Sequence, residues 1–242
     1  MAEEMPEPAE ERRAVYVWDL AVRLTHWVNV FCIAGLSVTG WYILDPFLAA
    51  PGGSGGFLMG TVRFVHFALA FAFTASVLFR VYWAIAGGEY ARWPWFLPTS
   101  RTRLRTFRDQ AFYYTFLRAK PPEQVGHNPL AGASYLAIYG LFFLQILTGF
   151  ALYSQGLEGG LWPLAFGWLL HLFGAQALRL VHTLVMFALM AFTVHHVYSA
   201  ALIDWEERSG MLSSIVTGFK SLTPSFLREA DRLAARQGRR HG

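Results

Sequence analysis

The sequence predicts an all-α integral membrane protein, a four-helix transmembrane bundle with both chain termini in the cytoplasm. Three observations support this fold class: the composition, four long apolar segments, and the placement of Lys and Arg. Of the 242 residues, 55% are apolar, 17% aromatic and only 15% charged. Soluble domains carry about 25% charged residues, so this composition indicates a chain that lies largely in lipid.

Four apolar segments follow one another at about 20–44, 62–87, 131–153 and 178–203. Each has at least the roughly 20 residues that an α-helix needs to cross about 30 Å of hydrocarbon. The start, MAEEMPEPAEERR, is acidic, whereas a signal peptide begins with basic residues and a short apolar core. We therefore expect the first span to be retained. The expected organisation is a disordered segment at 1–14, a membrane domain at 15–220 and a basic tail at 221–242.

Lys and Arg are distributed unevenly among the connections. They precede the first span, cluster in the loop at 88–130 and follow the fourth span, while the other two connections contribute only Arg63 and Arg179. Because cytoplasmic loops are enriched in Lys and Arg, both termini and this loop are expected on the cytoplasmic side of the cell inner membrane. The net charge of +4 thus follows from topology, and no nucleic-acid-binding motif accompanies it. We also expect an interfacial helix within 101–120 and a short helix on the outer surface within 154–177.

Spans two and four share two motifs at a constant offset of 116 residues: RFVH (63–66) with RLVH (179–182), and VYWA (81–84) with VYSA (197–200). Spans one and three share a weaker likeness, SVTGWYIL (37–44) with ILTGFALY (146–153). The chain is therefore expected to form two helical hairpins packed as one bundle, with cofactor sites between facing helices. The pairs Thr39-Gly40 and Thr148-Gly149 fit either small-residue helix packing or clearance for a macrocycle.

Five histidines lie within the spans, where polar groups are costly and usually functional: His26, His66, His182, His195 and His196. Alternating helix directions place His66 and His182 near the outer face and the others near the cytoplasmic face. At about 100° per residue, His196 lies within roughly 40° of the helix face of His182, whereas His195 lies roughly 140° away. His196 is therefore the predicted partner of His26. The two levels are separated by about 21 Å along the helix.

Paired histidines at two depths are typical of a cytochrome with two b-type haems, each iron held between two neutral imidazoles. Cys32 is the only cysteine, so an iron–sulfur site within the chain and covalent CxxCH haem attachment are excluded. The alternatives are histidines that only bond helix to helix, in a metal transporter or a non-redox membrane anchor. Pairing at matched depths favours haem, and an absorption spectrum distinguishes these classes.

Three of the four predicted ligands carry an arginine three residues earlier, at Arg23, Arg63 and Arg179. Residues three apart share a helix face, so each arginine can form a charge-assisted hydrogen bond with a haem propionate while its head reaches the interface. His196 has no such arginine. Arg80, its counterpart in the repeat, lies at the right depth to serve the inner haem.

Five polar residues near the cytoplasmic ends of the spans are candidates for a quinone site: His127, Asn128, His195, Asp204 and Glu206. His127 and Asn128 can hydrogen-bond a quinone carbonyl, with Asp204 or Glu206 supplying protons. Asn128 is equally well explained as the cap of a helix that begins at Pro129. For His195, a packing or hydrogen-bonding role is the alternative.

Residues 23–40, RLTHWVNVFCIAGLSVTG, resemble the first signature of the b-type cytochrome subunit of membrane-bound nickel–iron hydrogenases. The second signature fits residues 179–196 more loosely, with departures at Leu180, Thr183 and Phe187. Further likeness lies in RVYWAIAGGEYARW (80–93), GHNPLA (126–131) and LTGFALYS (147–154).

The resemblance implies two partner subunits on the outer face, a large subunit with a nickel–iron centre and a small iron–sulfur subunit. It also implies that electrons from hydrogen pass through the cytochrome to quinone. Combined with the two histidine pairs, it predicts transfer through two haems b and quinone reduction near the cytoplasmic face. A cytochrome b for another respiratory enzyme, such as a formate dehydrogenase or thiosulfate reductase, is the same-fold alternative. The loop motifs GEYARW and GHNPLA argue against it.

Overall fold

The computed structural model describes residues 12–47, 57–88, 91, 108, 112, 117, 129–207 and 210–222. It divides into two compact units. The terminal unit comprises Met1–Leu20, Gly88–Ala133 and Ser199–Gly242, and the helix unit comprises Ala21–Gly87 and Ser134–Tyr198. Residues 1–11 of the predicted disordered segment, most of the predicted interfacial helix and most of the predicted basic tail fall outside the described residues. Arg13 and Ala14, at the end of the first of these segments, lie in a β-strand.

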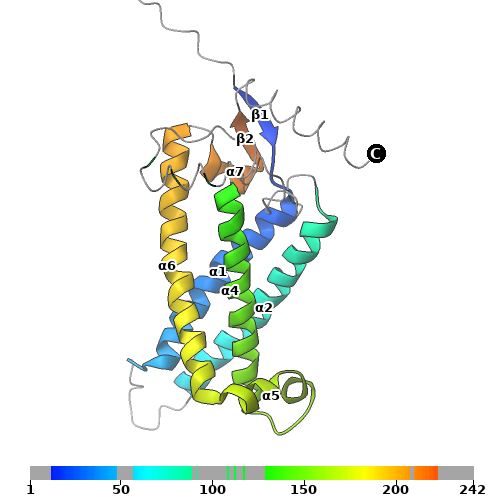
Figure 1. The fold of residues 1–242 in the computed structure, drawn as a ribbon, viewed down its shortest axis with the longest axis vertical. Coiled ribbons are helices and arrows are strands. Elements are labelled where there is room, and N and C mark those ends of the chain that lie inside the picture. The colour runs from blue at the N-terminus through cyan, green and yellow to red at the C-terminus, as the bar shows by residue number, and fades with distance from the viewer. Residues whose placement is uncertain are drawn as a thin grey trace, which may run out of the picture. The chain divides into compact units, whose positions relative to one another are not determined.

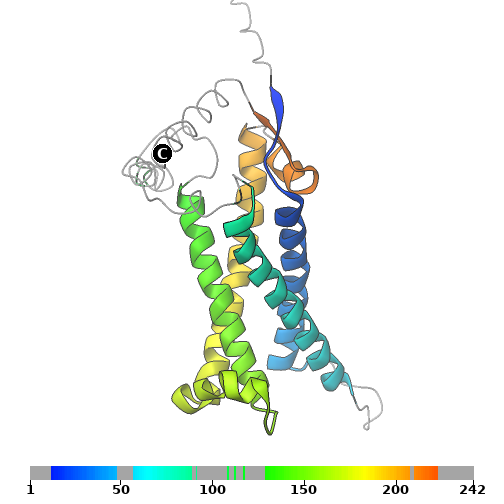
Figure 2. The same ribbon diagram turned by 90° about the vertical axis from the view of Figure 1, so that its right-hand side faces the viewer.

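Four long helices supply the helix unit: α1 (Leu20–Leu44), α2 (Leu58–Ala86), α4 (Pro129–Ser154) and α6 (Ala175–Glu207). They run alongside one another in both views (Figures 1 and 2). All four are long and apolar enough to cross a membrane, which confirms the four predicted spans. α2 begins four residues earlier than predicted and α6 extends further at both ends, because the helices continue past the apolar windows.

The core of the helix unit lies where all four helices meet. Its buried residues come from each of them: Cys32, Phe73, Val77, Ile138, Phe142, Val185 and Leu189. Phe73 of α2 packs edge-on against Phe142 of α4, with ring centres 5.0 Å apart. Outside this core few span residues are fully buried, with only 11% of the apolar window of α1 and 28% of that of α4 buried. Such apolar surface is suited to contact with lipid.

A short helix, α5 (Leu161–Phe173), joins the last two spans, as predicted for residues 154–177. Trp162 stacks on Phe150 of α4, with ring centres 4.8 Å apart, so α5 folds back onto the end of that span. A single residue, Gly174, separates α5 from α6 and has φ of 77°. Glycine tolerates this left-handed conformation and thereby allows two helices to meet without a longer loop.

The terminal unit contains a two-stranded antiparallel sheet that the sequence analysis did not predict. Strand β1 (Arg13–Tyr16) pairs with β2 (Phe219–Leu222), and helix α7 (Met211–Thr217) precedes β2. Trp18 Nε1 donates a hydrogen bond to Ser214 Oγ at 3.0 Å. Gly218 has φ of 90°, and a side chain there would meet the Tyr16 ring at 2.6 Å. Two segments about 200 residues apart in the sequence are thus hydrogen-bonded to each other within this unit.

Candidate functional site

The histidine pair predicted to lie nearer the cytoplasm, here called the inner pair, lies between the first and last spans. His26 of α1 and His196 of α6 lie with their ring centres 6.4 Å apart and their planes at 56°. Both side chains are half-buried, whereas His195 is exposed. Aromatic neighbours hold the two rings: Trp27 lies edge-on to His26 at 5.7 Å, and Phe192 stacks on His196 at 5.6 Å. Of the two adjacent histidines, His196 is therefore the one brought beside His26.

Each outer histidine faces a threonine on the preceding span. His66 Nδ1 lies 2.8 Å from Thr39 Oγ1, and His182 Nδ1 lies 2.9 Å from Thr148 Oγ1. The two histidines are close enough to interact electrostatically. Both side chains are half-buried in the helix unit. The Thr-Gly pairs that the sequence analysis left open therefore both lie against predicted ligands.

The glycine of each Thr-Gly pair also lies against a histidine ring. A Cβ added at Gly40 would come within 3.4 Å of His66 Cε1 and 3.3 Å of Met186 Sδ, and one at Gly149 within 3.1 Å of His182 Cε1. Met186 lies one helical turn after His182, so a side chain at Gly40 would meet residues on both α2 and α6. Glycine leaves the space that these rings occupy.

Two polar residues near the histidines were missed by the sequence analysis. Gln145 Nε2 lies 3.1 Å from His182 Nε2. The buried atoms Gln145 Oε1 and Asn29 Oδ1 have no hydrogen-bond partner among the described residues. The sequence does contain a signal for them, because an amide inside an apolar span is costly and usually has a function.

The predicted propionate-binding arginines differ in their surroundings. Arg23 and Arg80 are half-buried, while Arg63 and Arg179 are exposed. Arg179 Nη2 donates a hydrogen bond to Gln155 Oε1 at 3.2 Å. Arg80 interacts electrostatically with Tyr135 and Tyr139 of α4.

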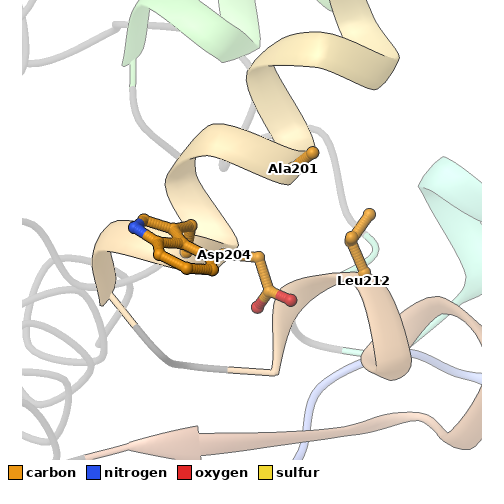
Figure 3. Close-up of a pocket in the computed structure, with 4 residues that line it drawn as sticks. Ala201, Asp204 and Leu212 are labelled. Atoms are coloured by element: carbon orange, nitrogen blue, oxygen red, sulfur yellow. The ribbon is translucent and has the colours of Figure 1, made fainter.

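Among the predicted quinone-site residues, Asp204 lines a pocket of about 430 Å³ with Ala201, Trp205 and Leu212. Its carboxylate lies between α6 and α7, with Leu212 across from it (Figure 3). Asp204 Oδ1 accepts a hydrogen bond from the backbone N–H of Met211. His127, Asn128 and the side chain of Glu206 fall outside the described residues. Helix α4 begins at Pro129, as the helix-capping interpretation of Asn128 predicts.

Comparison with known proteins supports the resemblance. The family described as "Prokaryotic cytochrome b561" matches residues 17–218. A "Probable Ni/Fe-hydrogenase B-type cytochrome subunit" of Cupriavidus necator is 39% identical over 217 residues, covering 86% of this chain and 88% of the relative. One of Rhizobium leguminosarum is 36% identical, covering 88% and 91%. A "Probable Ni/Fe-hydrogenase 1 B-type cytochrome subunit" of Escherichia coli K12 is 32% identical, covering 85% and 90%.

The family match covers residues 17–218, which contain all four spans and both histidine pairs, and each of these relatives covers most of the chain. The resemblance drawn from residues 23–40 and 179–196 is thereby confirmed. Four apolar helices and this family together indicate an integral membrane protein that carries haem b. The chain belongs to the prokaryotic cytochrome b561 family.

Proposed function

We propose that this chain is the di-haem b subunit of a membrane-bound nickel–iron hydrogenase and carries electrons from hydrogen to quinone. His66 and His182 would hold the outer haem, and His26 and His196 the inner haem. Haem b supplies reversible one-electron chemistry when bound. The relatives' names associate them with nickel–iron hydrogenases, and we extend that association to this chain.

The observation that carries the proposal is the spacing of the inner pair. A metal–imidazole bond of about 2 Å and about 1 Å from each nitrogen to its ring centre would put two imidazoles that share one metal roughly 6 Å apart. His26 and His196 lie 6.4 Å apart between ring centres. Both imidazoles are half-buried, and a neutral imidazole is a ligand that iron in haem takes. The residues present therefore fit a haem at this level.

At the outer level the fit rests on glycine and on the ring nitrogens. Gly40 and Gly149 leave the space beside His66 and His182 that a Cβ would fill. Each of these histidines is held through Nδ1, so Nε2 is the nitrogen that would bind a metal. At His182 the Gln145 amide lies 3.1 Å from Nε2 and would give way to the metal. Arg63 and Arg179, exposed one turn before these ligands, can reach propionates at the interface. Arg23 and Arg80 would serve the inner haem in the same way.

We propose that both termini lie in the cytoplasm and that the hydrogenase large and small subunits bind on the opposite face of the inner membrane. The distribution of Lys and Arg supports this orientation. It puts His66 and His182 near the iron–sulfur subunit and His26 and His196 near the cytoplasmic face. Hydrogen oxidation outside and proton uptake by quinone inside would then charge the membrane without a proton path through this chain.

For quinone we propose the pocket that contains Asp204. Its volume of about 430 Å³ is within the range of about 300–1,000 Å³ of small-molecule sites. Asp204 accepts a hydrogen bond from the N–H of Met211 through one carboxylate oxygen, and its other oxygen can take a proton from water and pass it to quinone. His127, Asn128, His195 and Glu206 are the further candidates from sequence.

An absorption spectrum of the purified chain tests the proposal directly. We expect dithionite-reducible b-type bands and two haems per chain by pyridine haemochrome assay. A colourless protein would favour the non-redox anchor or the metal transporter. Copurification then identifies the partner, because a formate dehydrogenase or thiosulfate reductase in place of hydrogenase subunits would favour the same-fold alternative.

Gly149→Val is expected to lower the haem content of the chain from two towards one. A Cβ at this position already lies 3.1 Å from the His182 ring, and the two methyl groups of valine add volume that the ring can accommodate only by moving. Haem per chain after purification measures the effect. Gly140→Val is the matched control on the same helix, because a Cβ at Gly140 meets no atom within 4 Å. Equal haem content in both variants would contradict this prediction.

A further inference from the structure

We propose that Thr39 and Thr148 are positioning residues for the outer haem. Each accepts a hydrogen bond from Nδ1 of the histidine on the next span and so presents Nε2 of His66 and His182 to the iron. The inference rests on the proposed function, since it takes these two histidines as haem ligands. It adds to that function a chemical difference between the outer and the inner site.

The direction of these hydrogen bonds follows from the carbonyl contacts of the threonines. A hydroxyl has one proton to donate. Thr39 Oγ1 donates to the backbone oxygen of Gly35 at 2.7 Å, and Thr148 Oγ1 donates to that of Leu144 at 2.7 Å. A backbone carbonyl can only accept, so both hydroxyl protons are engaged within the helix. Each threonine oxygen therefore accepts from the imidazole, whose Nδ1 must carry the proton.

Gln145 supports the same tautomer of His182 independently. Its side-chain nitrogen, 3.1 Å from His182 Nε2, belongs to an amide that can only donate there. His182 Nε2 must then accept through its lone pair, which agrees with a proton on Nδ1. That lone pair is the one that an axial ligand gives to iron. A ring held in this tautomer needs no proton rearrangement before it binds a haem.

The arrangement occurs twice, once in each half of the internal repeat. In each copy the glycine after the threonine gives the histidine ring room. A Cβ added there would lie 3.4 Å from the His66 ring at Gly40 and 3.1 Å from the His182 ring at Gly149. The Thr-Gly pair thus combines a hydrogen-bond acceptor with the space that the imidazole needs. Two copies in related positions argue against a chance contact.

The inner pair lacks this support. Neither His26 nor His196 has a hydrogen-bond partner among the residues that the structure describes, and aromatic rings hold both. A hydrogen bond at the second ring nitrogen raises the basicity of a histidine ligand. A more basic ligand stabilises ferric over ferrous iron. The reduction potential of the outer haem is therefore lower than the same two histidines would give without their hydrogen bonds to threonine.

Thr148→Val tests this role, because valine has the shape of threonine without the hydroxyl. We expect the outer haem of the purified protein to titrate at a more positive potential and to show an altered low-spin ferric EPR signal. Haem affinity at that site should fall about 10-fold, the lower end of the range for losing a hydrogen-bond partner of a ligand. Thr39→Val should shift the same haem in the same direction.

Two further variants separate positioning from folding. Thr148→Ser keeps the hydroxyl and should restore the wild-type potential and EPR signal. Thr193→Val removes the same kind of bond to a backbone carbonyl, that of Leu189 at 2.8 Å, where no histidine faces the threonine, and should leave both haems unchanged. Loss of haem in Thr148→Val with retention in Thr148→Ser also supports the role. An unchanged potential and EPR signal in Thr148→Val, or a serine variant equal to the valine variant, would overturn it.

His182→Ala keeps the two proposals distinguishable. If that variant retains both haems, the proposed ligand set is wrong. If it loses one haem while Thr148→Val leaves potential, EPR signal and haem retention unchanged, the ligand set stands and only the positioning role of the threonines fails.

Discussion

Replacing His182 by alanine is expected to remove the outer haem and to stop hydrogen-dependent quinone reduction. The iron would lose one of its two imidazoles. The loss of haem affinity should therefore exceed the roughly 10- to 100-fold loss that follows when only a hydrogen-bond partner of a ligand is removed. Hydrogen oxidation with a soluble dye should continue, because the dye takes electrons from the hydrogenase subunits themselves. Haem per chain and the two activities in membranes measure the outcome.

His171→Ala is the matched control for this variant. His171 lies on α5, is exposed, and is not among the paired histidines. Both variants remove one imidazole, one from α5 and one from the α6 helix that follows it, so a general loss of folding would affect both. Immunoblotting of membranes establishes that each protein is inserted. Quinone reduction at the wild-type rate in His182→Ala would show that electrons take another route.

The four spans and the histidine pairing were predictable because each depends on local, additive properties of the chain. A span needs only enough consecutive apolar residues, so α1 begins and ends where the sequence predicts. The partner of His26 follows from the phase of one helix, because about 100° per residue separates His196 from His195. Helix α6 is continuous through both, so that phase is preserved.

The sheet and the ligand contacts depend on what the chain brings together from a distance. Strands β1 and β2 have four residues each, and no alternating pattern identifies such short segments. The Thr-Gly pairs could be recognised in the sequence as a repeated motif. Only the packing of α2 against α1 and of α6 against α4 shows that the threonine hydroxyls face imidazole nitrogens. Gln145 is a single amide outside the repeated motifs, so only the packing of α4 against α6 shows that it faces His182.

His196→Ala is expected to remove the inner haem, while His195→Ala retains both haems. The rings of His26 and His196 lie 6.4 Å apart, whereas the side chain of His195 is exposed. An alanine at 196 leaves His26 as a single ligand, so the chain should purify with one haem. Quinone reduction should fall by more than the roughly 10- to 100-fold that follows loss of a ligand's hydrogen-bond partner. Haem stoichiometry and a redox titration with one component instead of two measure this.

Because the two histidines are neighbours on one helix, the pair of variants compares two alanines at the same depth that differ mainly in the direction they face. A general effect of a polar-to-apolar change at this level would therefore appear in both. Haem loss confined to His195→Ala would reverse the ligand assignment and require α6 to be rotated by about one residue, roughly 100°. Loss confined to His196→Ala, with the component assigned to the His66/His182 haem unchanged, would mean that the two levels bind their haems independently.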